Sequence, residues 1–370
     1  MVNRERMVEE FIQLASIDSL SKKERQMADR LIQKLEGMGY KVFEDNAGEK
    51  IGGNTGNLIC NVKGTKAVPA VMLCAHMDTV EPGLGKKPRV DGDYIKSDGT
   101  TVLGGDDLSG VVSIFEALRV LKEKDLEHGD IQVVFTADEE EGLLGSKNMD
   151  YSHIYAKYGI VLDSDGPIGS AAIKAPKQTN MFVTLKGKAS HAGMAPEKGI
   201  SAIQIASAAI YRMKLGRIDS ETTANIGTIK GGLATNIVCD TVDIVAEARS
   251  RDPLKLDAQI AHMKECFEQA ASEFGGGVEF KTELEYPSFS ISKDSKIISI
   301  MKKAAGEAEI ELCLGETGGG SDTNIYNGKG IEAVDVSAGM DKVHTVEERI
   351  LIDDLVKAAE FLLCIIRNIE

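Results

Sequence analysis

The stretch VPAVMLCAHMDTV, residues 68–80, decides the fold that this sequence predicts. Its first part, residues 68–76, is almost entirely apolar, which is typical of a strand buried on both faces of a sheet. A second apolar stretch lies at residues 131–136, and a helical pattern at 110–122 separates the two. Strand and helix therefore alternate, and this alternation predicts an α/β domain with a central mixed sheet.

The segment SKKE, residues 21–24, has the spacing of a helix capping box. In such a box the side chains of Ser21 and Glu24 would satisfy two free backbone N–H groups at the start of a helix. Apolar residues follow at helical spacing, and the pattern stops at Gly37. We therefore predict a helix that begins at this box.

The pattern changes near residue 178, where shorter strands alternate with two helical patterns. The strands are expected at 181–185, 224–230, 240–249 and 278–284, and the helices at 200–215 and 254–274. This order fits a small domain inserted into the first one. We therefore predict one domain made of residues 1–176 and 286–370, interrupted by a smaller α+β domain of residues 177–285.

The composition argues against several classes of partner. The formal net charge is −15, so the chain lacks the positive charge that binds nucleic-acid phosphates. The longest apolar runs, such as residues 361–366, are too short to span a bilayer, and the N-terminus is charged. Cys60, Cys74 and Cys364 lie in apolar runs, which predicts buried free thiols. We therefore expect a cytoplasmic protein with neither a nucleic-acid nor a membrane partner.

The motif HMD, residues 76–78, follows the buried strand directly. Residues i and i+2 of a strand point to the same side, so His76 and Asp78 could act together. His76 would bind a metal ion, and Asp78 would fix the ring by accepting its other N–H. The alternative is a histidine beside a surface turn, because short motifs also occur by chance.

The motif GGDD, residues 104–107, stands directly before the helical pattern. Paired glycines let the backbone bend sharply and present a carboxylate where a side chain would otherwise block the approach. Asp106 or Asp107 could therefore bind a metal ion, although Asp107 could also be a plain helix N-cap. The nearby segment GLGKK, residues 83–87, lacks the first Gly and the final Ser or Thr of a phosphate-binding loop.

The motif ADEEEG, residues 137–142, follows the second apolar strand. Neighbouring side chains of an extended segment project to opposite sides, so one of Glu139 and Glu140 could bind metal while the other faces a substrate. Consecutive acids repel one another unless cations or solvent compensate their charges. The alternative for this segment is a solvated acidic loop.

Two further motifs complete the set. LDSDG, residues 162–166, supplies Asp163 and Asp165 after another apolar strand, and KVHTVEE, residues 342–348, supplies His344. Histidines and carboxylates thus follow several apolar strands, which is where α/β sheets place their sites. His, Asp and Glu together suit zinc or a similar divalent ion, so the set predicts a metal site.

With these motifs the sequence resembles the M20 metallopeptidase family, and especially its peptidase T-like (tripeptidase-like) branch. The resemblance covers almost the whole chain, through HMDTV, SDGTTVLGGDD, ADEEEG, LDSDG, GKASHAGMAPEKG, ATNIVCD, AEARSRD, GGGSD and VHT. It implies a zinc-exopeptidase-like catalytic, metal-binding domain, here residues 1–176 and 286–370. It also implies a lid or dimerisation domain, here residues 177–285.

The resemblance assigns roles to the motif residues. The implied ligands of two divalent metal ions, zinc or else manganese or cobalt, are His76, Asp106, Glu140, Asp163 and His344. Asp106 would bridge the two ions, and Asp78 would orient His76. Glu139 would be the general base. The position of the ligand within LDSDG stays open between Asp163 and Asp165.

The resemblance also implies roles for residues outside this set. His191 matches a lid histidine that reaches into the partner's active site in family dimers, and Asn236, Arg249 and Gly319 match substrate-binding positions. From the residues alone, His191 could instead be a surface histidine, and Arg249 could form an ordinary ion pair. Gly318 stands where peptidase T has an arginine, so a preference for tripeptides is left open.

The function implied is metal-dependent hydrolysis of a peptide bond in short peptides, as in an aminopeptidase or tripeptidase, by a water that two metal ions activate. Glu139 would take the proton of this water and pass it to the leaving amine. A homodimer formed through the lid domain is expected. The alternatives are a deacylase of the same family that acts on an N-acyl amino acid, and a non-catalytic, metal-stabilised binding protein.

Overall fold

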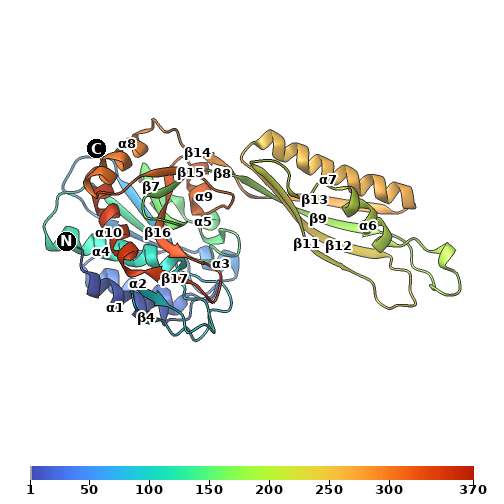
Figure 1. The fold of residues 1–370 in the computed structure, drawn as a ribbon, viewed down its shortest axis with the longest axis horizontal. Helices are drawn as coiled ribbons and strands as arrows, with labels where there is room; N and C mark the ends of the chain where they lie inside the picture. Colours follow the sequence, from blue (N-terminus) through green and yellow to red (C-terminus); the bar gives the residue numbers. More distant parts are fainter. Residues whose placement is uncertain (1) are drawn as a thin grey trace. The chain divides into compact units, whose positions relative to one another are not determined.

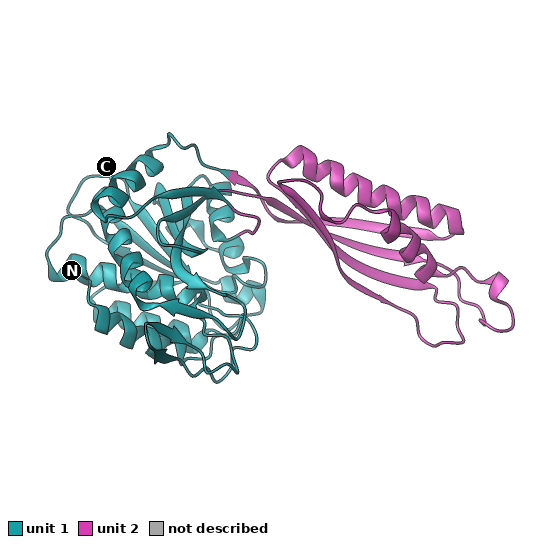
Figure 2. Cartoon of the chain, viewed as in Figure 1, with its two compact units in different colours: residues 1–173, 290–316, 321–370 teal, residues 174–289, 317–320 magenta. Residues whose placement is uncertain are grey.

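The computed structural model describes residues 2–370 and divides them into two compact units (Figure 2). Unit 1 contains the chain up to Ile173 together with Ser290–Glu316 and Ser321–Glu370. Unit 2 contains Lys174–Phe289 together with Thr317–Gly320. The short segment Thr317–Gly320 thus belongs to unit 2, although the chain on both sides of it belongs to unit 1.

Unit 1 is built on a mixed sheet, whose strands β7, β16 and β17 are labelled in Figure 1. The predicted apolar strand is β3 (Val71–His76), an interior strand of this sheet. All of β3 is buried, and it pairs in parallel with β6 (Ile131–Thr136) and with β7 (Tyr158–Asp165). The strand order is β1-β2-β6-β3-β7-β16-β17-β5-β4, with β1 Val42–Glu44, β2 Leu58–Val62, β16 Glu332–Asp341, β17 Arg349–Leu351, β5 Tyr94–Lys96 and β4 Arg89–Asp91. β8 (Ser170–Ala175) pairs with β16 and also with β14 (Phe289–Ser290) and β15 (Cys313–Glu316). Because β2 runs antiparallel to β6 while β3 runs parallel to it, the predicted α/β class with a mixed sheet is confirmed.

Helices cover both faces of this sheet because the residues of β3 alternate between two apolar clusters. Leu73 and Ala75 belong to the larger cluster, together with side chains of α1, α2, α4, α8 and α10. Met72 and Cys74 belong to the other cluster and pack with Tyr326 of α9. The helices of unit 1 are α1 Arg4–Ala15, α2 Arg25–Gly37, α3 Ala47–Ile51, α4 Gly105–Glu123, α5 Leu144–Asn148, η1 Tyr151–His153, α8 Lys296–Glu307, α9 Asp322–Gly328 and α10 Ile352–Arg367.

The capping box predicted at residues 21–24 is wrong. Helix α2 begins at Arg25, and its N-cap residue Glu24 makes no side-chain capping bond. The Ser21 hydroxyl instead donates to Asp78 Oδ2 at 2.7 Å, and Glu24 Oε1 accepts from the backbone N–H of Asp138 at 3.0 Å. Both side chains have partners far away in the sequence, and a local spacing pattern carries no information about such partners.

Unit 2 is an antiparallel sheet with helices packed on one face. The strand order is β10-β11-β12-β9-β13, with β10 Gly216–Arg217, β11 Thr222–Gly231, β12 Thr241–Ser250, β9 Lys177–Lys186 and β13 Gly277–Tyr286. The helices are α6 Ala202–Arg212 and α7 Pro253–Phe274, with the short η2 Pro196–Lys198 before them. Alternate residues of β9, such as Met181 and Val183, pack with α6 and α7, so the unit has its own apolar core.

Other sequence-based expectations have mixed outcomes. Cys60 and Cys74 are buried free thiols, as predicted, whereas Cys364 is only partly buried at the edge of the core of unit 1. In the part of the chain from residue 2 to residue 370, no helix combines the length and the apolar composition that crossing a membrane requires.

Glu10 joins three helices of unit 1 through ion pairs. Its carboxylate, buried on α1, accepts hydrogen bonds from Arg119 of α4 at 2.5 and 2.6 Å and from Lys34 of α2 at 2.7 Å. Burial alone would raise the pKa of Glu10, but the hydrogen bonds from Arg119 and Lys34 outweigh it and lower the pKa below its usual value. The ionised carboxylate is therefore part of what holds these helices together.

We expect Glu10→Gln to reduce the free energy of unfolding near neutral pH by about 3 kcal/mol, because it removes the buried charge that pairs with the partly buried Lys34 and Arg119. The folded pKa of Glu10 lies below its unfolded value. Its stabilising effect is therefore present above the ordinary glutamate pKa of about 4.3 and is lost as the pH falls through the folded pKa. Urea unfolding of the variant and the wild type at several pH values measures this.

The exposed neighbour Glu9 on the same helix provides the control. Glu9→Gln should change stability by no more than about 0.5 kcal/mol. A destabilisation by Glu10→Gln that stayed constant down to acid pH would show that packing, rather than charge, accounts for the effect.

Candidate metal centre

The site lies at the carboxyl edge of the unit 1 sheet. The parallel strands β3, β6 and β7 run side by side, and His76 at the end of β3 is in register with Thr136 at the end of β6. Glu139 and Glu140 follow Thr136 in the next loop, and Asp163 lies near the end of β7. Parallel strands thus bring together side chains that are far apart in the sequence.

The five predicted ligands form one connected group. His76 Nε2 lies 2.8 Å from Asp106 Oδ1 and 3.6 Å from Asp163 Oδ1. His344 Nε2 lies 3.2 Å from Asp106 Oδ2 and 3.0 Å from Glu140 Oε2. Asp106 therefore stands between the two histidines, with one carboxylate oxygen directed to each.

This group of donors fits divalent metal ions. One ligand atom each of His76, Asp106 and Glu140 lies within 4.8 Å of the others, and the same holds for His76, Asp107 and Asp163. Burial raises the pKa of Asp163 and of Glu140, because desolvation disfavours the charged carboxylate. Within residues 2–370 no lysine or arginine forms an ion pair with these acids. A divalent cation would supply the missing positive charge, and imidazole and carboxylate are ligands that zinc and similar ions accept.

The two histidines lie in surroundings that favour positive charge. Burial lowers the pKa of His76, but its contacts with Asp106, Asp163 and Asp78 outweigh it and raise the pKa well above the usual value. Hydrogen bonds to Asp106 and Glu140 raise the pKa of His344 to about 10. The carboxylates thus attract a cation at both imidazole nitrogens, whether it is a proton or a metal ion.

Asp78 holds both the ring of His76 and the loop that carries the two glutamates. His76 Nδ1 lies 3.0 Å from the backbone carbonyl of Asp78 and 3.4 Å from its Oδ1. The Asp78 carboxylate accepts the backbone N–H groups of Glu139 at 3.0 Å and Glu140 at 3.2 Å. When Nδ1 donates to Asp78, Nε2 is left free to bind a metal ion.

The carboxylate of Glu139 lies among the proposed ligands but is not bonded to any of them. Its side chain is buried, with 8% of the residue exposed, and within residues 2–370 its carboxylate makes no hydrogen bond. Burial, and then the charge of Asp163, raise the pKa of Glu139 well above its usual value. A carboxylate in this state is suited to accept a proton and to release it again.

The residues between which the sequence left a choice lie in different surroundings. Asp163 lies in the cluster, whereas Asp165 is exposed and belongs to no donor group of the centre. Asp107 has non-helical backbone angles and caps the regular helix that follows, since its Oδ1 accepts the backbone N–H of Gly110 at 3.1 Å. Its Oδ2 accepts the backbone N–H of His76 at 3.2 Å. Glu141, the last acid of its motif, is exposed and pairs with a lysine.

Two buried acids that were not predicted from the sequence hold the segments that carry the proposed ligands Asp106 and Asp163. Glu348 accepts the backbone N–H groups of Leu103, Gly104 and Asp106 at 2.7, 2.8 and 3.0 Å, and burial raises its pKa to about 7. Asp335 of β16 accepts the backbone N–H of Asp163 at 3.3 Å, and burial raises its pKa to about 7 as well. Glu348 lies in the same sequence motif as His344, and this position was the one indication that it belongs to the site. No sequence motif indicated a role for Asp335.

The remaining predicted site residues lie in unit 2. His191 and Asn236 are exposed and lie in neighbouring segments, since the backbone of Ala192 bonds to that of Asn236 at 2.9 Å. His191 Nδ1 accepts the backbone N–H groups of Gly193 and Met194, each at 3.2 Å, so the ring proton is carried by Nε2. His191 therefore presents a hydrogen-bond donor to solvent.

Arg249 does not present a free guanidinium. Its Nε and Nη2 donate to the two carboxylate oxygens of Glu247 at 3.2 and 2.9 Å, and its Nη1 lies 3.2 Å from the hydroxyl of Tyr286. The ring of Tyr286 also packs on Gly320, where an added Cβ would lie 2.2 Å from it. The ion pair considered for Arg249 is therefore present. A substrate carboxylate could form a bidentate pair with Nε and Nη2 of Arg249 only by displacing Glu247. Gly319 donates its N–H to Thr317 Oγ1 at 3.1 Å.

Comparison with known proteins agrees with the motifs. Residues 72–368 match peptidase family M20/M25/M40. The chain is 48% identical to the protein YqjE of Bacillus subtilis, over 100% of this chain and 99% of that protein. The crystal structure of aminopeptidase PepT from Bacillus cereus is 46% identical, with a TM-score of 0.92 over 100% of this chain and 99% of that one. A tripeptidase from Staphylococcus aureus is 40% identical, with a TM-score of 0.95 over 99% and 98% of the two chains. The chain therefore belongs to peptidase family M20/M25/M40, and it is a peptidase, as its motifs predicted.

Proposed function

We propose that this peptidase hydrolyses short peptides with the help of two divalent metal ions. The observation that carries the proposal is the position of Asp106, whose two carboxylate oxygens lie 2.8 Å from His76 and 3.2 Å from His344. Asp106 would be shared by both ions, and the other ligands would be His76, Glu140, Asp163 and His344. Zinc is the proposed metal because it accepts nitrogen and oxygen donors together, and manganese and cobalt share this property.

Metal ions bound there would act as Lewis acids that polarise the scissile carbonyl and lower the pKa of a water molecule. Glu139 would accept a proton from the attacking water on its unpaired carboxylate and then donate it to the nitrogen of the leaving amine. Asp78 would keep Glu139 in place through the backbone N–H that it accepts. A peptide substrate is proposed because the related proteins from Bacillus cereus and Staphylococcus aureus are an aminopeptidase and a tripeptidase.

We further propose a cytoplasmic homodimer formed through unit 2, in which the Nε2–H of His191 stabilises the oxyanion at the site of the partner subunit. Unit 2 exposes large apolar side chains, including Tyr211 of α6 with 91% of its surface exposed and Ile229 of β11 with 53%. Exposed apolar surface of this kind is typical of an interface between subunits. The exposed free thiol of Cys313 suits a reducing compartment.

Removal of the metal should abolish activity without unfolding the protein. We expect the chelated protein to keep its circular dichroism spectrum and to recover activity when zinc, manganese or cobalt is added. Zinc at about 1,000 times its dissociation constant should add about 4 kcal/mol to the free energy of unfolding, since it binds only the folded chain. Activity toward dipeptides, tripeptides and N-acyl amino acids, with metal content measured by elemental analysis, tests this. Full activity of a metal-free sample would contradict it.

Substitution of the adjacent glutamates should separate the proton carrier from the ligand. Glu139→Gln should lower kcat by about 10²–10⁴-fold and leave the metal content unchanged, because the amide keeps the shape but accepts no proton. Glu140→Gln should lower the metal content. Glu141→Gln, at the exposed third glutamate, is the matched control and should retain both. Loss of metal from Glu139→Gln would show that the roles of the two glutamates are reversed.

The shared site predicts complementation between two inactive variants. In an equimolar mixture of His191→Ala and Glu139→Gln, about half of the dimers would be mixed, and each would contain one site with both residues intact. Activity should therefore recover to about a quarter of the wild-type value per site if the subunits exchange freely. Steady-state assays before and after mixing measure it. A monomeric mass in solution together with full wild-type activity would rule out the shared site.

A further inference from the structure

The loop that carries Glu139 and Glu140 has a backbone that needs support from outside. It folds tightly on itself, with the carbonyl of Glu139 accepting the N–H groups of Gly142 at 3.0 Å and Leu143 at 2.7 Å. Asp138 and Leu143 have φ values of 50° and 61°, in the left-handed region that side chains disfavour. Such strained positions persist only where surrounding structure holds them.

Asn57 ties the two ends of this loop together. It precedes β2, is 0% exposed, and donates through Nδ2 to the carbonyl of Gly145 at 2.9 Å. Its Oδ1 accepts the N–H of Ala137 at 3.2 Å. The ends lie so close that a Cβ on Gly145 would be 2.0 Å from the carbonyl oxygen of Ala137. One buried amide therefore satisfies the backbone at both ends of the loop.

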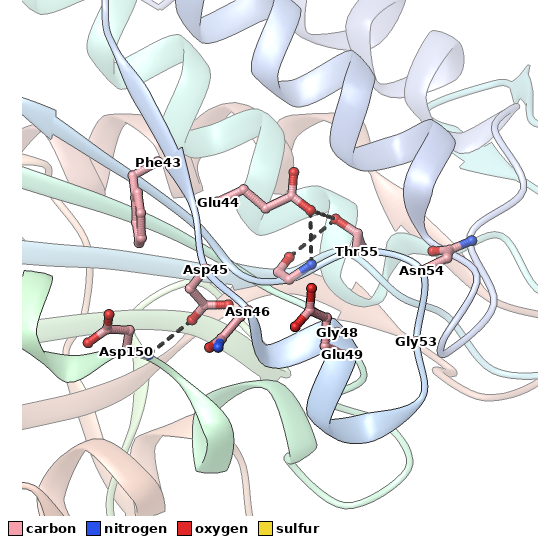
Figure 3. Close-up of a pocket in the computed structure, with 11 residues that line it drawn as sticks. Phe43, Glu44, Asp45, Asn46, Gly48, Glu49, Gly53, Asn54, Thr55 and Asp150 are labelled. Carbon is pink, nitrogen blue, oxygen red and sulfur yellow. Dashed lines mark hydrogen bonds between the residues drawn. The ribbon is translucent and has the colours of Figure 1, made fainter.

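Asp45 fixes which way this amide faces. Its Oδ2 accepts the other Nδ2–H of Asn57 at 2.9 Å, and its Oδ1 accepts the backbone N–H of Asn57 at 2.9 Å. Asp45 also accepts the N–H of Asp150 at 3.1 Å, at the wall of a cavity of about 600 Å³ (Figure 3). Because a carboxylate only accepts, Nδ2 has to face Asp45, and Oδ1 is left to face Ala137.

From this geometry we infer that Asn57 is a positioning residue for the reaction. Asp78 holds the middle of the loop, at the N–H groups of Glu139 and Glu140, and Asn57 holds its ends. Without the Asn57 amide, a buried N–H and a buried carbonyl would lose their partners, and the strained turn would relax. The inference rests on the roles proposed above for the two glutamates.

The test compares Asn57→Ala with Gln132→Ala in the full-length protein. Gln132 of β6 is also 0% exposed, and its amide bonds to Asn61, to the carbonyl of His153 and to the N–H groups of Tyr155 and Ala156. It thus holds a loop without predicted ligands. Both variants should lower Tm, but only Asn57→Ala should lower kcat, by about 10–100-fold with little change in KM. Only Asn57→Ala should weaken zinc binding, by about 10-fold or more.

Hydrogen exchange adds a readout that does not depend on activity. Amides of residues 142–144 should exchange faster in Asn57→Ala than in Gln132→Ala. If Asn57→Ala does not fold, Asn57→Ser and Gln132→Ser replace the pair. Equal kcat and equal zinc affinity in the two variants, whether both are retained or both are lost, would overturn the inference. Glu140→Gln is measured in the same experiment. If Glu140→Gln keeps its zinc and its activity, the proposed function is wrong. If Glu140→Gln loses zinc while Asn57→Ala behaves like Gln132→Ala, only the role of Asn57 is wrong.

Discussion

The contact of Asp106 with two histidines is the constraint on which unit 1 depends. His76 ends the interior strand β3, and His344 follows β16 near the C-terminus, so the carboxylate joins distant parts of the chain. A buried carboxylate requires compensating positive charge. In the part of the chain from residue 2 to residue 370, only these two rings form ion pairs with Asp106. The surrounding structure therefore has to hold an acid-rich cluster together against the repulsion among its members.

At four of the five proposed metal ligands, a second buried acid accepts the backbone N–H of the ligand residue. The pairs, with the ligand first, are His76 with Asp107, Asp106 with Glu348, Glu140 with Asp78 and Asp163 with Asp335. A bond to the backbone fixes the main chain and leaves the ligand's own side chain free for the metal. These second acids add further carboxyl groups to the same region, and all of them count in the formal net charge of −15.

The sequence predicted those features of unit 1 that leave a local pattern, namely the apolar strands and the polar motifs next to them. The apolar run ending at His76 identified an interior strand of the sheet, and the motifs after strands or before a helix contained every proposed ligand. Glu348, Asp335 and Asn57 were not predicted as site residues, because their roles depend on backbone groups that only the folded chain brings near. Ser21 was misinterpreted for the same reason, since its partner Asp78 is remote in the sequence. Likewise, no local pattern indicated that Thr317–Gly320 groups with unit 2.

His344 differs from the other proposed ligands because no buried acid accepts its backbone N–H within residues 2–370. Within residues 2–370 its backbone N–H makes no hydrogen bond, its φ is 61°, and its side chain is 50% exposed. The ring is therefore held by Asp106 and Glu140, rather than by its own main chain. The other proposed ligands are thus held through their backbone N–H groups, whereas His344 is held through its ring.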